Sequence, residues 1–292
     1  MTLPHSLRAF RHRDYRLYFA GQGISQIGTW LQLIATSWLI YQMTHSEFML
    51  GLAAFALHIP LLVLGPFAGV WVDRFHKRKV LLVTQNLALA QSLVVLALVA
   101  TDTVQPWHLV AANVWFGVVN SVDNPARHAQ LVELVGGRED LPNAIALSST
   151  LMNGSRFVGP MIGGAVISAF GEAWSFGLNA LLRFAVIIAL ILIRAQPRPT
   201  EKGGHGWLQQ LGEGFRYAFG FLPSRSALLL LAAVSLAVQP YQSLAPYFAR
   251  DVFQGDSRTL GFLIGAGGFG AVSGMVYLAR ASLRGLLRLL PL

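Results

Sequence analysis

The chain has 292 residues, of which 54% are hydrophobic and 12% are charged, and its mean hydropathy is +0.53. A soluble protein draws about a quarter of its residues from the charged types, so this composition favours a membrane protein. The net charge is +9, but Lys and Arg lie between apolar runs rather than in one stripe, so we expect no nucleic-acid binding. Cysteine is absent, which excludes disulfides and thiolate metal sites.

Eight apolar runs approach the roughly 20 residues that a helix needs to cross a membrane. In chain order they lie at 17–42, 48–72, 80–101, 107–125, 144–170, 174–194, 226–249 and 259–280. The chain is therefore expected to be an all-α polytopic membrane protein.

The longest polar interval separates the sixth run from the seventh. It begins RAQPRPTEKGGHG, a Pro/Gly-rich linker, and continues WLQQLGEGFRYAF, in which Trp207, Leu208, Leu211, Phe215 and Phe219 recur near helical spacing. We expect the second piece to be an amphipathic helix on the cytoplasmic face of the bilayer. The chain then divides into a six-helix unit at 1–194, a linker at 195–225 and the start of a second unit at 226–292.

The positive charges indicate an orientation. Of the 22 Lys and Arg, all but Arg156, Arg183, Arg250 and Arg258 lie at the N-terminus or in links that would share its side of the membrane. The positive-inside rule makes that side cytoplasmic. The first apolar run is long and ends without a small-residue cleavage site, so we expect the N-terminus to be retained.

Polar side chains recur inside the expected spans, where an unpaired polar group is costly. The first span places Gln22, Gln26 and Thr29 on one helical face, and later spans add Asn113 and Asn153. We expect these residues to line a polar cavity. The alternative is hydrogen bonding between helices, which is common in membrane bundles.

Two arginines, Arg156 and Arg183, fall within expected spans. A guanidinium near mid-membrane costs at least about 2.5 kcal/mol, so each should face the protein interior. Arg183 lies one helical turn after Asn179, and both could point at one cavity. An anionic group on a substrate is one candidate partner; snorkelling or bonding to backbone carbonyls is the alternative.

The fifth span carries a cluster of helix-perturbing residues, Gly159, Pro160, Gly163 and Gly164. Proline removes a helical hydrogen bond, and glycines allow a neighbouring backbone to approach closely. The cluster therefore predicts a bend at a packed helix interface.

The stretch GVWVDRFHKRKVL at 69–81 resembles the signature that joins helices 2 and 3 of major facilitator superfamily transporters, Gly-x-Leu-Ala-Asp-Arg-x-Gly-Arg-Lys-x-x-Leu. The run GPMIGG at 159–164 is similar to the core of an exporter signature in that superfamily. The stretch NSVDNPARHAQLVELVGGREDLPNAIALSS is similar to a bacterial exporter branch. The resemblance implies the major facilitator fold and secondary active export of siderophore- or drug-like molecules by alternating access across the bacterial inner membrane.

The resemblance also implies that the residues matching the signature form a cytoplasmic latch rather than a substrate site. These residues are Gly69, Asp73, Arg74, Lys77 and Arg78, joined by Asp123. By this analogy Asp73 faces a helix end in the second half, and Asp123 pairs with Lys77.

The chain departs from the family in three places. His76 stands in place of a glycine and Lys77 in place of an arginine, which removes a forked contact. Asn113 stands where the family often has an arginine four residues before a glycine. Proton coupling through that arginine is therefore not expected, and the proton remains only a candidate coupling ion. The family has twelve spans where eight are expected here, so we expect a truncated or partial transporter, with a non-transporting remnant as the alternative.

A membrane-embedded enzyme is disfavoured because the sequence has neither HExxH nor a Walker phosphate loop, and its His residues are scattered. We therefore expect no catalytic residue, no metal and no cofactor. The expected partners are the lipid bilayer and a small-molecule substrate.

Overall fold

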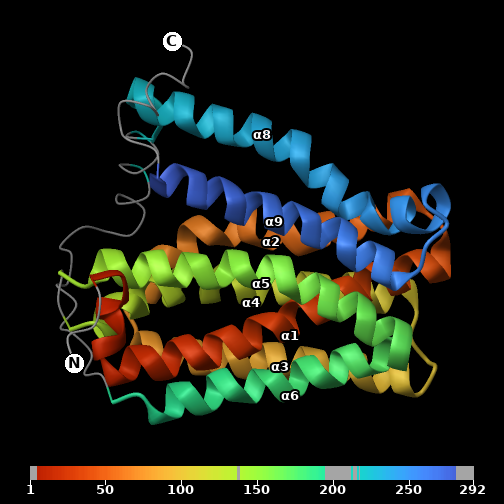
Figure 1. The fold of residues 1–292 in the computed structure, drawn as a ribbon, viewed down its shortest axis with the longest axis horizontal. Helices are drawn as coiled ribbons and strands as arrows, with labels where there is room; N and C mark the ends of the chain where they lie inside the picture. Colours follow the sequence, from red (N-terminus) through yellow and green to blue (C-terminus); the bar gives the residue numbers. More distant parts are fainter. Residues whose placement is uncertain (1–4, 137–138, 195–211, 213–215, 217, 281–292) are drawn as a thin grey trace.

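The computed structural model describes residues 5–136, 139–194, 212, 216 and 218–280, and long helices running nearly side by side dominate it (Figure 1). No strand occurs within those ranges, which confirms the all-α expectation. The long helices are α1 (Arg13–Thr44), α2 (Glu47–Asp73), α3 (Lys77–Ala100), α4 (Pro106–Leu134), α5 (Leu141–Phe170), α6 (Glu172–Leu192), α8 (Leu222–Tyr247) and α9 (Ser257–Arg280). A short 3₁₀ helix, η1 (His5–Arg11), precedes α1, and a π-helical turn, η2 (Phe248–Val252), follows α8.

Each expected span coincides with one of these helices, and most boundaries agree within a few residues. The exception is α4, which was expected to end at 125 and instead continues to Leu134. Pro125 removes one backbone donor, but the helix runs through it. Arg127 consequently lies inside α4 rather than in a link.

The first six helices pack in a fixed pattern. Helix α1 packs against α5 and α6, α4 packs against α2 and α3, and α3 also contacts α6. Helix α9 packs along α5. Apolar side chains fill this bundle in two main clusters, one around Ile34, Trp38 and Phe176 and another around Tyr15 and Leu190.

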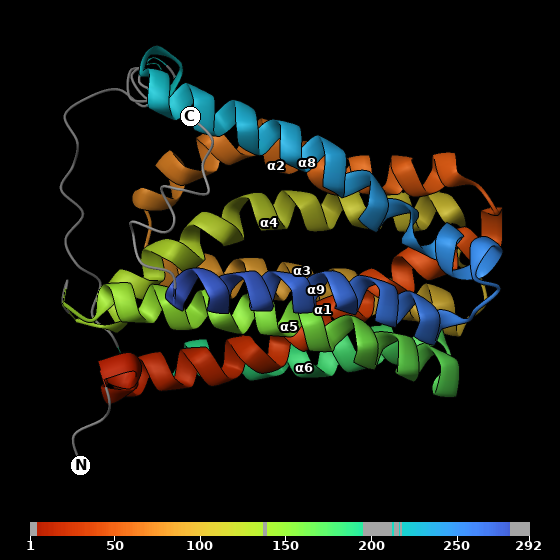
Figure 2. The ribbon, with the colours of Figure 1, turned by 45° about the horizontal axis from the view of Figure 1, so that its top comes forward.

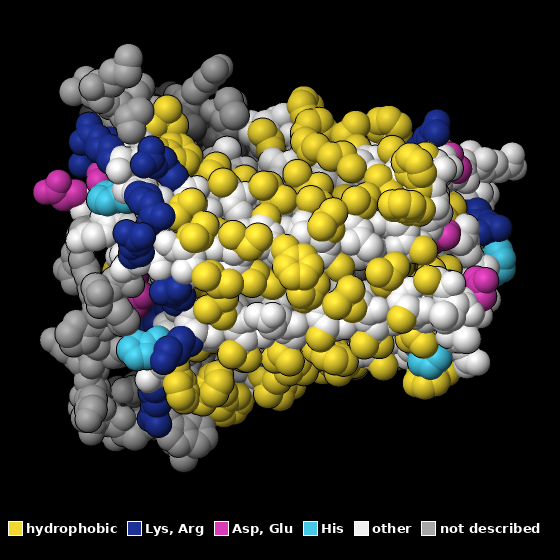
Figure 3. Space-filling model, turned by 90° about the horizontal axis from the view of Figure 1, so that it is seen from below, with side chains coloured by type: hydrophobic (Ala, Val, Ile, Leu, Met, Phe, Trp, Pro, Cys, Tyr) yellow, Lys and Arg dark blue, Asp and Glu magenta, His cyan; other side chains and the backbone are white. Residues whose placement is uncertain are grey.

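The surface has an apolar middle and charged ends. Figure 3 shows hydrophobic side chains over the middle of the bundle and Lys and Arg gathered mainly at one end. We call that end, which holds η1 and the α2–α3 link, the basic end; the end with the α1–α2 link and η2 is the opposite end. Helices α2, α3 and α6 and the run Leu222–Val252 are long and apolar enough to cross a membrane on length and composition alone.

Helix α8 joins the bundle at the opposite end. Its residues 222–237 are nearly all exposed, whereas Ala245 and Ala249 just beyond them are fully buried. Figures 1 and 2 show α8 diverging from α9 toward the basic end. The linker expected at 195–225 and its amphipathic segment fall mostly outside the described residues, so the proposed division of the chain stays a prediction.

Candidate functional site

A partly polar hollow lies between α1, α2 and α4, and α8 and α9 border its second space. It consists of two adjoining spaces of about 230 and 210 Å³ that share Leu33, Leu57 and His58 as lining residues. We call the pair the inner chamber. The polar lining of the first space is Gln26, Thr29, His58, Asn120, Asn124 and Arg127. Among the described residues, no Asp or Glu lines either space, and Arg127 is the charged side chain in the lining.

Arg127 supplies that charge, and it is held from behind. Its Nε forms an ion pair with the Asp123 carboxylate one helical turn earlier, and its Nη1 donates to the Gln26 side-chain oxygen at 3.4 Å. The Asp123 side chain is 1% exposed and also accepts bonds from Thr84 Oγ1 at 2.5 Å and Gln85 Nε2 at 2.8 Å. A buried carboxylate is tolerated when it is paired and bonded in this way, so Arg127 is fixed at the chamber wall.

A second polar group is sealed within the bundle. Arg183 is 1% exposed; it donates from Nη1 to Gln85 Oε1 at 3.1 Å and from Nη2 to Asn179 Oδ1 at 3.4 Å. Asn179 donates in turn to Gln32 and, at 2.7 Å, to Ser92 Oγ. We call this set the buried network; it links α1, α3 and α6, and through Gln85 it reaches Asp123 on α4.

Sequence reasoning placed Arg183 in a cavity, and the structure places it in this packed network instead. The guanidinium is not among the chamber-lining residues; its carbon lies 5.9 Å from the centre of the Phe116 ring, which does line the chamber. Arg183 and Asn179 are both buried, and they bind each other and neighbouring amides.

The other expected cavity residues fall in different places. Gln26 and Thr29 line the chamber, and Asn113 lines its second space while donating to the Ala53 carbonyl at 3.0 Å. Gln22 lines a separate space of about 40 Å³ beside Arg127.

Asn153 and Arg156 do not line the chamber. Asn153 donates to the Ser149 carbonyl of its own helix at 2.8 Å. Arg156 is half-buried on α5, and its buried Nε has no hydrogen-bond partner among the described residues.

The glycine cluster of α5 lies at two helix interfaces. A Cβ on Gly159 would lie 2.6 Å from Cβ of Trp30 on α1, so only glycine fits there. Gly163 also faces α1, at Leu31. On the other side, Ser257 at the start of α9 donates to the Gly164 carbonyl at 3.0 Å. Pro160 lies within the helix, and its carbonyl faces Gly261 of α9.

The stretch 69–78 forms the end of α2, a tight link and the start of α3. Lys77 Nζ donates to the Asp73 backbone carbonyl at 2.9 Å. Arg78 reaches α6, where its Nε and Nη2 donate to the carbonyls of Leu190 and Ile191 at 2.6 and 2.7 Å. No hydrogen bond or ion pair joins the Asp73 carboxylate to a described residue.

The expected pair of Asp123 with Lys77 does not form. Asp123 lies deep in the bundle between Arg127, Thr84 and Gln85, whereas the Lys77 amine covers the C-terminal carbonyl end of α2. That position suits a cation because the end of a helix carries partial negative charge. Gly69 has open space where a Cβ would stand, and Arg74 is exposed.

Contacts at the opposite end were not anticipated from the sequence. The Tyr41 hydroxyl of α1 bonds to the Asp251 carboxylate of η2, and Ser168 Oγ of α5 donates to Asp256 at 3.3 Å. Burial alone would raise the pKa of Asp256, but the N–H groups of Thr259 and Arg258 and the Ser168 hydroxyl stabilise the carboxylate, and the pKa is lowered overall. These contacts fasten α8 and α9 to the first six helices.

A small charge cluster ties down the basic end. Asp140, before α5, binds His12 Nε2 and Arg8 Nε, each at 3.0 Å. The hydrogen bond from His12, reinforced by the charge of Arg8, lowers the pKa of Asp140. Within the part of the chain that the structure describes, no group of three or more His, Asp or Glu is placed to hold a metal ion.

Comparison with known proteins identifies the family. The family described as "Transmembrane secretion effector" matches residues 5–288. The enterobactin exporter EntS of Shigella boydii serotype 18 and that of Escherichia coli O139:H28 are each 30% identical to this chain over 288 residues, which is 96% of this chain and 67% of the exporter. These matches agree with the all-helical, apolar-surfaced fold. The chain therefore belongs to the major facilitator superfamily, in its transmembrane secretion effector family, and is a membrane transporter rather than an enzyme.

Proposed function

We propose that the chain is a secondary active exporter of small molecules that works by alternating access in the bacterial inner membrane, with its N-terminus in the cytoplasm. The observation that carries the proposal is the inner chamber, a partly polar hollow whose lining includes Arg127 and several amide side chains. In hydrocarbon such a surface is favourable only if it faces water or a polar ligand. Substrate binding accounts for the polar lining of the inner chamber.

The chamber chemistry favours a substrate with an anionic or strongly accepting group. Arg127 offers a charged donor, and Gln26, Asn120 and Asn124 offer amides around it. Apolar side chains such as Leu57 line the rest of the wall and suit an apolar or aromatic body. The similarity to enterobactin exporters supports a siderophore- or drug-like substrate.

The two ends of the bundle suggest how access would alternate. Tyr41 and Asp251 close the opposite end, while α8 diverges from the bundle toward the basic end. By the positive-inside rule the basic end is cytoplasmic, so this arrangement is open toward the cytoplasm. Export would then require the opposite-end contacts to break and the basic end to close.

The residues of the 69–78 stretch are proposed to stabilise the closed basic end. The Asp73 carboxylate, at the end of α2, has no described partner and could receive one when the halves approach. Gly69, with open space around its Cα, would allow a close approach, and Arg74 is exposed beside it. The proposed partner of Asp73 is the N-terminus of a helix in the second half. A carboxylate placed there contributes about 0.3 to 1 kcal/mol, which is enough to bias two states of similar energy.

The coupling ion is proposed from the chamber lining. His58 is the histidine among the described chamber-lining residues, and its Nδ1 lies 2.8 Å from the Ala54 carbonyl oxygen. A proton entering or leaving this imidazole would change the charge facing the substrate. The proton is thus the proposed coupling ion.

The test is accumulation of a catecholate siderophore or an anionic dye in cells that express the chain, compared with empty cells. Expression should lower accumulation, and Arg127→Gln should weaken export about tenfold or more, as expected for loss of a charge-assisted bond of about 1.5 to 3 kcal/mol. Arg127→Lys should retain part of the activity. Arg194→Gln, an exposed arginine at the basic end, is the matched control and should behave as wild type.

Equal accumulation in expressing and empty cells for a broad substrate set would refute the exporter proposal. Wild-type export by well-expressed Arg127→Gln would refute only the role of Arg127.

A further inference from the structure

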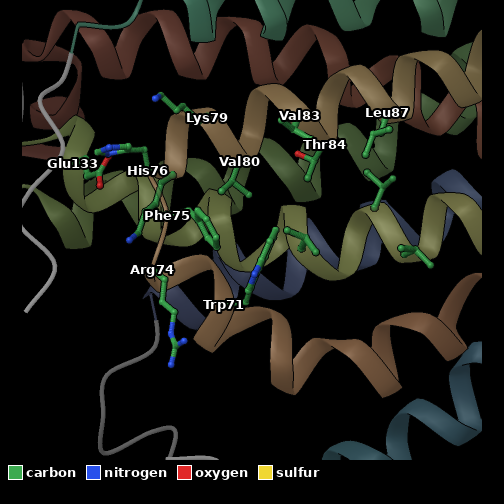
Figure 4. Close-up of a pocket in the computed structure, with 14 residues that line it drawn as sticks. Trp71, Arg74, Phe75, His76, Lys79, Val80, Val83, Thr84, Leu87 and Glu133 are labelled. Carbon is green, nitrogen blue, oxygen red and sulfur yellow. The ribbon is translucent and has the colours of Figure 1, made fainter. Parts of the chain in front are cut away.

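A second large hollow lies outside the inner chamber. It is a groove of about 760 Å³ between α2 and α3 at the basic end. Apolar side chains form its walls and floor: Trp71, Phe75, Val80, Val83, Leu87 and Val118. We call it the α2–α3 groove (Figure 4).

The groove faces away from the chamber. Its floor includes Val118 and Val122 of α4, whereas Asn120 and Asn124 of the same helix line the chamber. Residues two apart on a helix point about 200° apart, so the two hollows lie on opposite faces of α4. The groove therefore opens on the outer surface of the first six helices.

The exposed apolar walls place the groove in contact with lipid. Trp71 is 50% exposed and Val83 is 59% exposed, and both belong to helices that are long and apolar enough to cross the membrane. The indole of Trp71 packs against the Phe75 ring, with centroids 4.7 Å apart and planes tilted by 54°, near the basic end. Aromatic residues favour the bilayer interface. An acyl chain is the apolar group that this surface meets.

Cations surround the mouth of the groove. Arg74 and Lys79 project on either side of it in Figure 4, and His76 lies between them in the sequence. The neighbouring Lys77 and Arg78 donate to backbone carbonyls, but no hydrogen bond or ion pair joins Arg74, His76 or Lys79 to a described residue. Glu133 also lines the mouth, so the fixed charge there is positive overall but partly offset.

From this combination we infer that the α2–α3 groove binds an anionic phospholipid, with an acyl chain along the groove and the phosphate between Arg74 and Lys79. Basic clusters at the cytoplasmic end of membrane helices attract anionic headgroups, at about 1 kcal/mol for each Lys or Arg near the surface. The apolar groove adds selectivity for a molecule that carries an acyl chain as well as a phosphate. Neither the family nor transport requires this site.

The test is native mass spectrometry of the full chain in detergent, with added phosphatidylglycerol or phosphatidylethanolamine of the same acyl composition. The wild type should retain several-fold more phosphatidylglycerol. The double variant Arg74→Gln/Lys79→Gln should lose this preference, because each charge near the surface contributes up to about 1 kcal/mol, or about fivefold. The matched double variant Arg194→Gln/Arg225→Gln removes two exposed arginines elsewhere and should keep the preference.

Two further measurements separate the contribution of the apolar groove to lipid binding from that of the positive charges. Val118→Trp should fill the floor and lower retention of both lipids while the protein stays monodisperse. Glycerol phosphate, which has the anion without an acyl chain, should not displace bound phosphatidylglycerol. Equal retention of the two lipids by wild type, an unchanged preference in the Arg74/Lys79 variant, or full displacement by glycerol phosphate would overturn the inference.

Discussion

Arg127 and Arg183 are two arginines held near the same carboxylate, Asp123, in opposite ways. Arg183 is sealed, with a side chain 1% exposed and bonds to Gln85 and Asn179. Arg127 is 15% exposed, pairs directly with Asp123 and lines the chamber. The first arginine joins helices to one another, while the second faces the inner chamber. The burial of each arginine and the groups around it, rather than the residue type, distinguish the packed position from the chamber-lining one.

The largest effect on stability should come from Arg183→Leu. The change leaves the buried oxygens of Gln85 and Asn179 without a donor, at about 1 to 3 kcal/mol each, so the yield and thermal stability of the folded protein should fall sharply. Thermal unfolding in detergent, followed by fluorescence-detected size-exclusion chromatography, measures this loss of stability. A variant as stable as wild type would show that the network contributes little to the fold.

An intermediate loss is expected from Ser92→Ala. Ser92 Oγ accepts from Asn179 at 2.7 Å and donates toward Gln32 at 2.7 Å, and bonds between membrane helices are worth about 0.6 kcal/mol each. The expected destabilisation is about 1 kcal/mol, with export unchanged. A selective loss of export at normal stability would instead place Ser92 on the transport path.

Asn120→Ala in the chamber should show the reverse pattern. Its side chain lines the first chamber space, so stability should change by less than about 0.5 kcal/mol while substrate preference changes. Export of several related substrates, compared with Ser92→Ala at matched expression, measures the difference. If Asn120→Ala and Ser92→Ala lose stability equally, the proposed difference in role between the inner chamber and the buried network is wrong.

The smallest effect concerns the surface cluster of Asp140, which lies in neither region. Because its folded-state pKa is lowered, its stabilising contribution is present above the unfolded-chain value of about 4 and is lost as pH falls through the lower folded value. Wild type should therefore lose slightly more stability than Asp140→Asn between pH 6 and pH 3. Thermal unfolding at both pH values tests this, and identical pH profiles would contradict it.

Much of the fold was predictable because membrane helices are long and uniformly apolar. Every expected span is a helix, and the stretch 69–81 spans the α2–α3 link. The end of α4 was missed because Arg127 was counted with the charges of a link, whereas the helix continues to Leu134. The ion pair at spacing of four residues, Asp123 to Arg127, was the available signal that the helix continues.

The site was only partly predictable because periodicity identifies a polar face but not the helix that it meets. Gln26 and Thr29 line the chamber, yet Arg183, chosen by the same reasoning, is enclosed by amides from α3 and its own helix. The pair of Asp123 with Lys77 followed from analogy and failed because Arg127 lies closer. The bond from Tyr41 to Asp251 joins residues far apart in sequence, and no local pattern reveals such a contact.

The two bonds from Arg78 to the end of α6 carry a mechanical consequence. Charge-assisted bonds of this kind are worth about 1.5 to 3 kcal/mol each, so the start of α3 cannot slide along α6 without breaking both. On the other flank, the Asp73 backbone carbonyl accepts from Lys77, while its carboxylate has no partner among the described residues. A displacement of the link at Asp73 would be transmitted through Arg78 to the last turn of α6. This corner would thus couple movement of the α2–α3 link to the chain that follows α6.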